Sequence, residues 1–202
     1  MFRKNPVVLS LTLTIALSLN INHAKSETIN LAKKTDKATT KNTTPELTLG
    51  EQAYQAFEEG KYITAQKLAK EAAKNEEANA YTLLGRIYAA GLGIPKNMKT
   101  AAEWYQKGAE KDEVHSLVAL GAQYATGNGV KKNSFTAANL FERAAKMGEI
   151  QAQYNLALIY TKGDGRKRDL YAAAEWMKKA AEGDLNVAQY GLGTLYATGS
   201  GV

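Results

Sequence analysis

Histidine and cysteine are the side chains that most often act as nucleophiles, general bases and metal ligands, and this chain of 202 residues has few of them. Cysteine is absent, which excludes disulfides, a thiolate nucleophile and cysteine-ligated zinc. The two histidines, His23 and His115, are far apart in the sequence, and no pair has the spacing of metal ligands. The sequence therefore predicts a protein that is not an enzyme, with no metal site and no cofactor.

Glycines at G-x-G spacing recur at residues 91–93, 127–129, 163–165 and 199–201, but the further glycine or lysine of a phosphate-binding loop is missing. These glycines instead belong to an internal repeat with a step of 36 residues. The repeated positions are Gly85, Gly121, Ala157 and Gly193; Tyr88, Tyr124, Tyr160 and Tyr196; Gly91, Gly127, Gly163 and Gly199; and Gly93, Gly129, Gly165 and Gly201. One step length in so many registers indicates an array of similar structural units.

Each unit is predicted to be a pair of helices. Its first helix carries apolar residues at helical spacing, as in Ala80, Leu84 and Ile87, and G-x-G then ends the helix. A small residue such as Gly85 inside this helix makes sense where a neighbouring helix comes close. The second helix is expected to be capped by Asn97, Asn133 or Asp169 and to bury Trp104, Leu140 or Trp176.

The rest of the chain suggests export and a tether. Basic residues followed by an apolar run of about 13 residues are typical of a signal peptide, predicted here over residues 1–26, although an uncleaved anchor or a buried strand also fits. Residues 27–48 are predicted to be a flexible linker, with a glycosylation acceptor pattern at Asn42. Residues 49–77 read as an atypical first helix pair, and residues 78–202 hold three complete units and a fourth that stops after its first helix.

The pattern A-x-x-x-L-G-x-x-Y-x-x-G-x-G-V, then A-A-x-W and K-A-A, resembles the Sel1-like repeats, which are relatives of the tetratricopeptide repeats. Residues 116–130, 172–181 and 188–202 carry it, while Leu140, Ala157 and Arg166 depart from it. The resemblance implies an all-α, right-handed α-solenoid of stacked antiparallel helix pairs, acting as an adaptor in the periplasm or outside a bacterial cell. Some relatives with paired cysteines are linked to β-lactam or peptidoglycan binding, so a cell-wall or β-lactam-hydrolysing enzyme is the alternative function, and a purely structural spacer is a third.

A solenoid of this kind offers a concave face, so the predicted partner is another protein or a peptide. Residues 49–202 carry 19 basic and 17 acidic side chains, which does not favour nucleic-acid binding. Partner-contacting residues are expected where the first helices vary, in two rows four residues apart. The candidates are Thr82, Arg86, Val118, Tyr154, Leu158, Tyr190 and Thr194. The alternative for Tyr154 and Tyr190 is packing between units.

The last first helix has no second helix after it in this sequence. It is expected either to be a natural cap or to mark a truncated chain, and the truncated form would leave Leu195 and Tyr196 uncovered. Self-association through this helix is therefore a further prediction.

Overall fold

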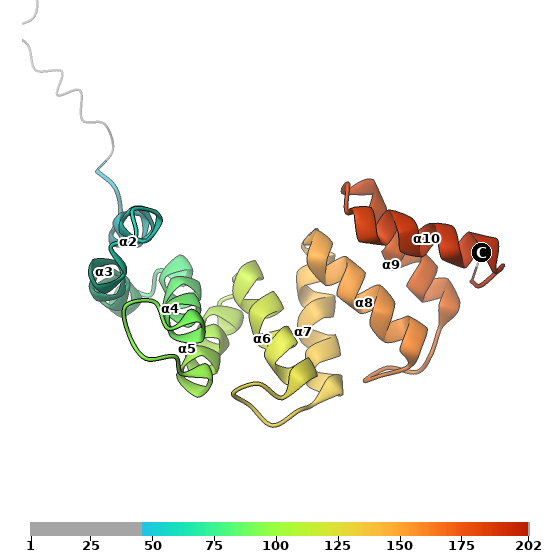
Figure 1. Cartoon of the computed structure of the whole chain (residues 1–202), viewed down its shortest axis with the longest axis horizontal. Helices are drawn as coiled ribbons and strands as arrows, with labels where there is room; N and C mark the ends of the chain where they lie inside the picture. Colours follow the sequence, from blue (N-terminus) through green and yellow to red (C-terminus); the bar gives the residue numbers. More distant parts are fainter. Residues whose placement is uncertain (1–45, 202) are drawn as a thin grey trace, which may run out of the picture. The chain divides into compact units, whose positions relative to one another are not determined.

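A computed structural model describes residues 46–201. The predicted signal peptide, His23, Asn42 and nearly all of the predicted linker lie outside the described residues. The described part contains helices and no strand (Figure 1). The helices are α2 (Leu49–Glu58), α3 (Tyr62–Lys74), α4 (Ala78–Ala90), α5 (Met98–Glu110), α6 (Val114–Thr126), α7 (Ser134–Lys146), α8 (Ile150–Lys162), α9 (Leu170–Glu182) and α10 (Asn186–Ala197).

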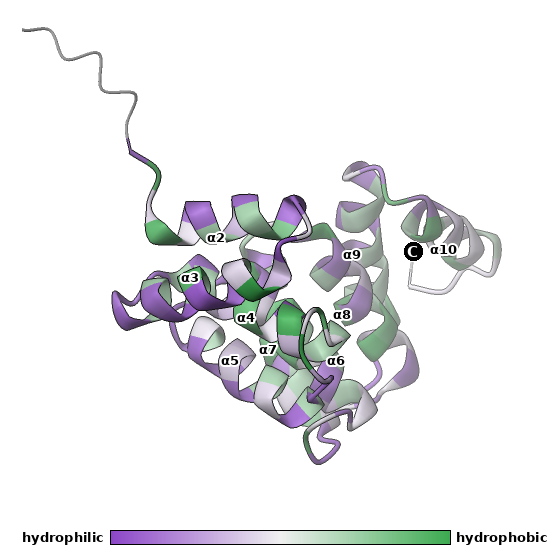
Figure 2. Ribbon diagram, turned by 60° about the vertical axis from the view of Figure 1, so that its left-hand side comes forward, coloured by the Kyte–Doolittle hydropathy of each residue, from purple (hydrophilic) through white to green (hydrophobic). Residues whose placement is uncertain are grey.

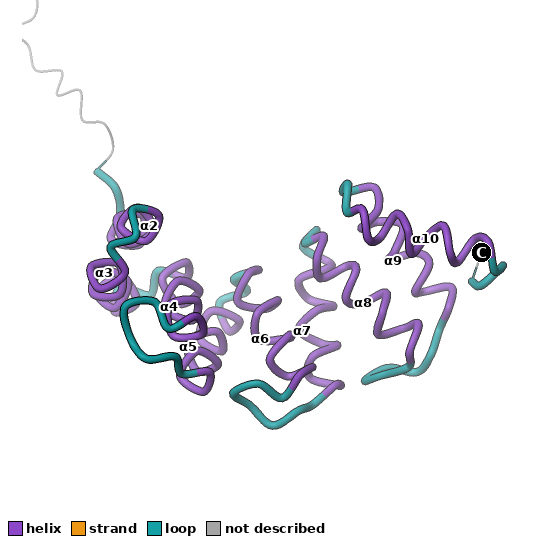
Figure 3. The backbone as a smooth tube through the Cα atoms, viewed as in Figure 1, coloured by secondary structure: helices purple, strands orange, loops and turns teal. Residues whose placement is uncertain are grey.

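The helices form a stack in which each one packs on its neighbours in the sequence. We call α2, α4, α6, α8 and α10 the first helices, and α3, α5, α7 and α9 the second helices. First helices of successive units also meet, since α2 contacts α4 and α4 contacts α6. The tube in Figure 3 shows the pairs following one another from α2 to α10. The predicted all-α solenoid of stacked helix pairs is confirmed.

The turn inside each unit is fixed by glycine geometry and by a helix cap. In the α6–α7 turn, Gly127 and Gly129 have φ of 80° and 82°, a left-handed conformation that glycine adopts without strain. A Cβ on Gly129 would lie 2.3 Å from the carbonyl oxygen of Met98, so glycine is also required by the close approach of α5. Asn133 then begins α7, and its side chain accepts a hydrogen bond from Thr136 N at 3.0 Å.

The two other predicted caps are formed in the same way. Asn97 accepts from the backbone N–H of Thr100, and Asp169 accepts from that of Ala172, both at 3.0 Å. The prediction that these residues cap the second helices is therefore confirmed. Such a cap contributes about 1 kcal/mol, because it satisfies a backbone N–H that the helix itself leaves free.

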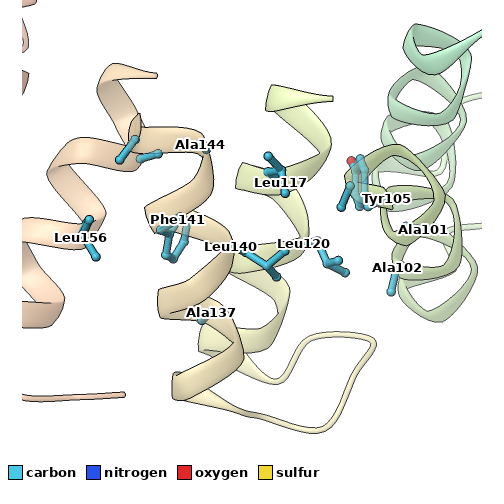
Figure 4. Packing of buried hydrophobic residues seen from close by; sticks show 13 residues of the cluster. Ala101, Ala102, Tyr105, Leu117, Leu120, Ala137, Leu140, Phe141, Ala144 and Leu156 are labelled. Carbon is cyan, nitrogen blue, oxygen red and sulfur yellow. The ribbon is translucent and has the colours of Figure 1, made fainter. Parts of the chain in front are cut away.

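The core between the helices is built from small residues facing one large side chain per second helix. A Cβ on Gly85 would lie 2.3 Å from the ring of Tyr105, and one on Gly121 would lie 3.0 Å from Phe141. Tyr105 and Phe141 are 5 % and 3 % exposed and belong to the same cluster (Figure 4). Figure 2 shows hydrophilic and hydrophobic residues on different sides of the helices, as one apolar stripe per helix requires.

The predicted burial of the tryptophans is only partly correct. Leu140 is buried, but Trp104 and Trp176 are half-buried, and lysines lie over both rings. Successive residues on an α-helix are about 100° apart around its axis, so Trp104 and Tyr105 cannot both face Gly85. The structure turns Tyr105 towards that glycine and leaves Trp104 at the edge of the core.

A carbonyl in the last turn of every second helix receives a hydrogen bond from a side chain. The pairs are Tyr81 to Ala73 at 3.3 Å, Gln153 to Ala145 at 3.3 Å and Gln189 to Ala181 at 3.4 Å. In the unit between them the equivalent residue is Leu117, which cannot donate. Arg143 reaches the Ala109 carbonyl instead, at 2.7 Å, and so every member of the series is satisfied.

The last helix, α10, packs on α9. Leu195 is only 8 % exposed, so the expectation that it would be uncovered is wrong. The reason is that Leu195 belongs to a buried cluster that α9 supplies with Ala174, Met177 and Ala180 and that α8 supplies with Ala157. Val187, Tyr190 and Tyr196 remain exposed on the same helix.

Candidate functional site

The first row of predicted partner-binding residues lies at different depths. Thr82 is buried, Val118 and Tyr154 are half-buried, and Tyr190 is 81 % exposed. Val118 packs against the cluster that contains Phe141, and Tyr154 against the cluster of α8, α9 and α10. These two side chains therefore combine a packing role between units with a surface that a partner can still reach.

Thr82 joins two units rather than facing solvent. Its hydroxyl donates to a carboxylate oxygen of Glu113, and it lies 2.6 Å from the hydroxyl oxygen of Ser116. The same carboxylate oxygen accepts from the Ser116 backbone N–H at 2.7 Å, at the start of α6. Because Thr82 is 2 % exposed and engaged in this network, we do not carry it into the candidate site.

Arg86 stands beside an aromatic hollow on the first-helix side of the stack. The hollow has a volume of about 350 Å³ and is lined by Phe57, Arg86, Ala89, Ala90, Leu92 and Tyr105. The guanidinium carbon of Arg86 is 4.6 Å from the centroid of the Phe57 ring, which is the geometry of a cation–π contact. This contact holds the long side chain of Arg86 at the rim, where the residue is exposed.

Two tyrosines near this hollow stay neutral over the physiological pH range. Burial raises the pKa of Tyr105 to about 12, against a smaller opposing effect of the Arg86 charge. Burial also raises the pKa of Tyr54, again opposed by Arg86. Arg86 is therefore the one charged side chain among the residues that line this hollow. Such a site suits an acidic or polar group attached to an apolar segment.

A second hollow lies between α6 and α8 and includes the predicted residue Leu158. Its volume is about 280 Å³. The lining consists of Ala122, Ala125, Thr126, Phe141, Asn155, Leu158, Ile159, Lys162 and Asp164. Ala122 and Leu158 stand 36 residues apart, at the repeat position that Arg86 occupies in α4. The repeat thus places one hollow beside Arg86 and another between the next two first helices.

Tyr190 and Thr194 lie on α10 and line neither of these hollows. Both are exposed, and the Thr194 hydroxyl donates to the carbonyl of Tyr190 at 3.0 Å. We name the surface formed by Arg86, Val118, Tyr154, Leu158 and the two hollows the first-helix face. Tyr190 and Thr194 extend it along α10.

Sequence reasoning missed the aromatic residues that form the floor of the hollows. Phe57 belongs to the atypical first pair, where no repeat pattern draws attention to it. Tyr105 and Phe141 could have been found, because they stand at one repeat position and each lies 20 residues after a helical glycine. A glycine inside a helix predicts a large partner opposite, and this pairing was the usable signal.

Neither metal-binding nor membrane-spanning features appear within residues 46–201. No group of three or more His, Cys, Asp or Glu side chains there is arranged to hold a metal ion. No helix of that part has the length and apolar character needed to cross a membrane.

Comparison with known proteins agrees with the repeat geometry. A family model described as "Sel1 repeat" matches residues 78–113, 114–149, 150–185 and 186–202. A Sel1 repeat protein from Oxalobacter formigenes is similar in structure, with a TM-score of 0.72 and 28 % identity, over 75 % of this chain and 62 % of that one. No curated protein matches.

A second solved structure is a protective antigen present in uropathogenic Escherichia coli strains, which displays an SLR fold. Its TM-score is 0.69 and its identity 31 %, over 78 % of this chain and 38 % of that protein. This chain therefore spans less than two thirds of the length of both relatives.

Proposed function

Because this chain belongs to the Sel1 repeat family, whose members are generally protein–protein interaction scaffolds, we propose that it is an exported scaffold that binds a partner polypeptide on its first-helix face. The observation that carries the proposal is the hollow beside Arg86, where one exposed guanidinium is held over Phe57 next to the buried, neutral Tyr105. Arginine and aromatic side chains in such hollows are frequent anchors of protein interfaces.

The second hollow supports a partner that extends along the stack. Its wall is largely apolar, with Phe141, Leu158 and Ile159, while Lys162 and Asp164 supply polar groups. A segment that places an acidic or polar side chain at Arg86 and an apolar one at Leu158 would use both hollows. A helix or an extended peptide of a partner protein has this bipartite character.

Export is the second part of the proposal and is supported by the sequence. The basic residues Arg3 and Lys4 precede an uncharged apolar run, and residues 24–26 suit a cleavage site. We propose cleavage near Ser26, with residues 27–48 left as a tether to the helical units. Amino-terminal sequencing of protein from the periplasm or medium tests this step, and an intact Met1 in the cytoplasm would contradict it.

The binding proposal is tested by crosslinking and affinity capture with the mature protein. We expect Arg86→Glu to abolish recovery of a specific partner and Tyr154→Ala to reduce it. The matched control is Lys178→Glu, which reverses an exposed charge on the second helix α9 and should leave recovery unchanged. Equal recovery with Arg86→Glu and with Lys178→Glu would refute the first-helix face as the binding surface.

Self-association through α10 is a further part of the proposal. Val187, Tyr190 and Tyr196 are 52 %, 81 % and 56 % exposed on this helix, and exposed apolar groups of this size favour contacts between molecules. Analytical ultracentrifugation is expected to show concentration-dependent association that Tyr190→Asp weakens. A monomer at every concentration would contradict it.

A further inference from the structure

A separate cleft lies between α3, α4 and α5, and two stacked aromatic rings form its floor. The cleft has a volume of about 340 Å³ and is lined by Lys70, Ala73, Lys74, Tyr81, Trp104 and Lys107. The rings of Tyr81 and Trp104 are 6.3 Å apart between centroids and inclined by 19°. Tyr81 is fixed further by its hydrogen bond to the Ala73 carbonyl. The floor is therefore rigid and apolar, and the half-buried Trp104 leaves part of its indole accessible.

Three lysines surround this floor. The ammonium nitrogen of Lys107 is 4.3 Å from the centroid of the Trp104 ring. Lys74 pairs with Glu71 at 2.9 Å, whereas Lys70 and Lys107 form no ion pair with any residue from 46 to 201. In Figure 2, α3 shows hydrophilic residues in purple alternating with hydrophobic ones. The cleft thus carries an excess of positive charge beside the partly accessible indole of Trp104.

The same place in the later units lacks this combination. Between α5, α6 and α7, the residues at the repeat positions of Lys70 and Lys74 are Gln106 and Glu110. Its cation, Arg143, is already used by Asp112 at 2.5 Å and by the Ala109 carbonyl. The fold therefore does not require lysines at the first cleft, and their presence there needs another reason.

The equivalent place between α7, α8 and α9 provides a closer comparison. It repeats the tryptophan and its lysine, since the Lys179 ammonium nitrogen is 4.2 Å from the centroid of the Trp176 ring. However, Glu142 stands at the position of Lys70, and Gln153 at the position of Tyr81. This place has the lysine-over-tryptophan contact without the aromatic pair, and its other lysine, Lys146, is paired with Glu142 at 2.7 Å.

We propose that the cleft between α3, α4 and α5 binds a short acidic peptide segment of a partner protein, with carboxylates on the lysines and a neighbouring apolar side chain on Trp104. Charge complementarity argues for the acidic character. The positive charge is confined to this cleft, because Glu110 and Glu142 stand at the equivalent lysine positions farther along the stack. A ligand that matches this charge is therefore a short segment. A nucleic acid or another long polyanion would need a continuous basic track.

This cleft is independent of the first-helix face. It is lined mainly by the second helices α3 and α5, and it shares no residue with the hollow beside Arg86. Loss of binding at one site therefore leaves the other intact, and the failure of either proposal can be recognised separately.

Fluorescence anisotropy with a fluorescein-labelled peptide, acetyl-EEFEE-amide, tests the proposal on the purified protein. The neutral peptide QQFQQ is the control for charge. We expect saturable binding of EEFEE that weakens as salt is raised, because the ion pairs are exposed to solvent. In a Trp176→Phe variant, Trp104 is the remaining tryptophan, and its emission should change as EEFEE saturates.

The decisive variants are Lys107→Glu and its repeat equivalent Lys179→Glu. We expect Lys107→Glu to weaken EEFEE binding by roughly tenfold or more, since it replaces an attraction with a repulsion, and Lys179→Glu to change it by less than about twofold. Lys70→Glu is a second variant on a different helix and should weaken binding in the same direction. Circular dichroism of each variant checks that the helices are intact.

Three results would overturn the proposal. The first is equal binding of EEFEE and QQFQQ. The second is an equal loss of binding in Lys107→Glu and Lys179→Glu. The third is tighter binding of a 12-nucleotide oligothymidine with the same dependence on Lys107, which would assign the cleft to nucleic acid instead of an acidic peptide.

Discussion

Gln123 gives a stability prediction that depends on one buried amide. The residue is 5 % exposed, and neither its amide nitrogen nor its amide oxygen has a hydrogen-bond partner within the described part of the chain. The other units have Ile87, Ile159 and Leu195 at this position, of which Ile87 is fully buried. The site is thus an apolar position of the repeat that carries a polar group in one unit.

The expected effect follows from the cost of burying an unpaired amide. Mutational data place this cost at about 1–3 kcal/mol, so Gln123→Met, which keeps the length of the side chain, should raise the free energy of unfolding by about 2 kcal/mol. For a domain of this size, that gain corresponds to a rise in Tm of about 4–8 °C. Urea unfolding followed by circular dichroism measures it as a higher midpoint.

Gln153 is the matched control, because it is also buried but its amide is satisfied. It is 8 % exposed and donates to the Ala145 carbonyl at 3.3 Å. Gln153→Met should therefore lower the free energy of unfolding by about 1 kcal/mol, since it removes this bond and leaves the carbonyl unpaired. Repeat arrays can lose cooperativity, so the two variants are compared only where the slopes with urea agree.

The test is the opposite sign of the two changes in the free energy of unfolding, a rise for Gln123→Met and a fall for Gln153→Met. If Gln123→Met lowers the midpoint or leaves it unchanged, the amide of Gln123 must have a partner such as a buried water molecule. The reasoning from an unpaired buried group would then be refuted for this site.

Other predictions concern packing and charge. Gly85→Ala should lower the free energy of unfolding, because the new Cβ would lie 2.3 Å from the tyrosine ring that it faces, whereas Gly193→Ala, with nothing within 4 Å, should raise it by up to about 1 kcal/mol through helix propensity. Thermal melts of both variants test this, and a loss in Gly193→Ala would contradict it. Hydrogen bonds from Lys146 and then from Arg166 lower the pKa of Glu142. A depressed folded-state pKa stabilises the protein above the ordinary glutamate pKa and ceases to do so as pH falls through the folded value. Glu142→Gln should therefore cost up to about 1 kcal/mol at pH 7 and less at pH 3. Urea midpoints at the two pH values measure this difference, and an equal cost at both would rule out the linkage.

Local features of the fold were predictable from the sequence because they depend on neighbouring residues. The glycines at 127 and 129 fix the turn through backbone conformation, and Asn97 and Asn133 cap helices through their own side chains. The step of 36 residues then fixes the succession of helix pairs, since each pair needs the next to cover its apolar stripe.

The candidate binding surface was predictable only in part. Arg86 and Leu158 were expected on the first-helix face, and the structure places each of them at a hollow. Thr82 belongs to the other predicted row, but it is buried and its hydroxyl donates a hydrogen bond to Glu113. Variation between repeats does not reveal whether a side chain meets solvent or the adjoining unit, because this depends on how closely the two helices approach.

The amino-acid sequence alone determined the helix pairs, their turns and caps and the repeating stack, because these follow from backbone geometry and from a periodic apolar pattern. The tertiary structure decided which large side chain fills each gap, Tyr105 instead of Trp104, and that the amide of Gln123 has no partner. It also brought Lys70, Trp104 and Lys107 together from two helices into one cleft. The physical reason is that the apolar face of a helix is wider than the area that a neighbouring helix covers. The distance and orientation of that neighbouring helix therefore decide which residues of the face are buried.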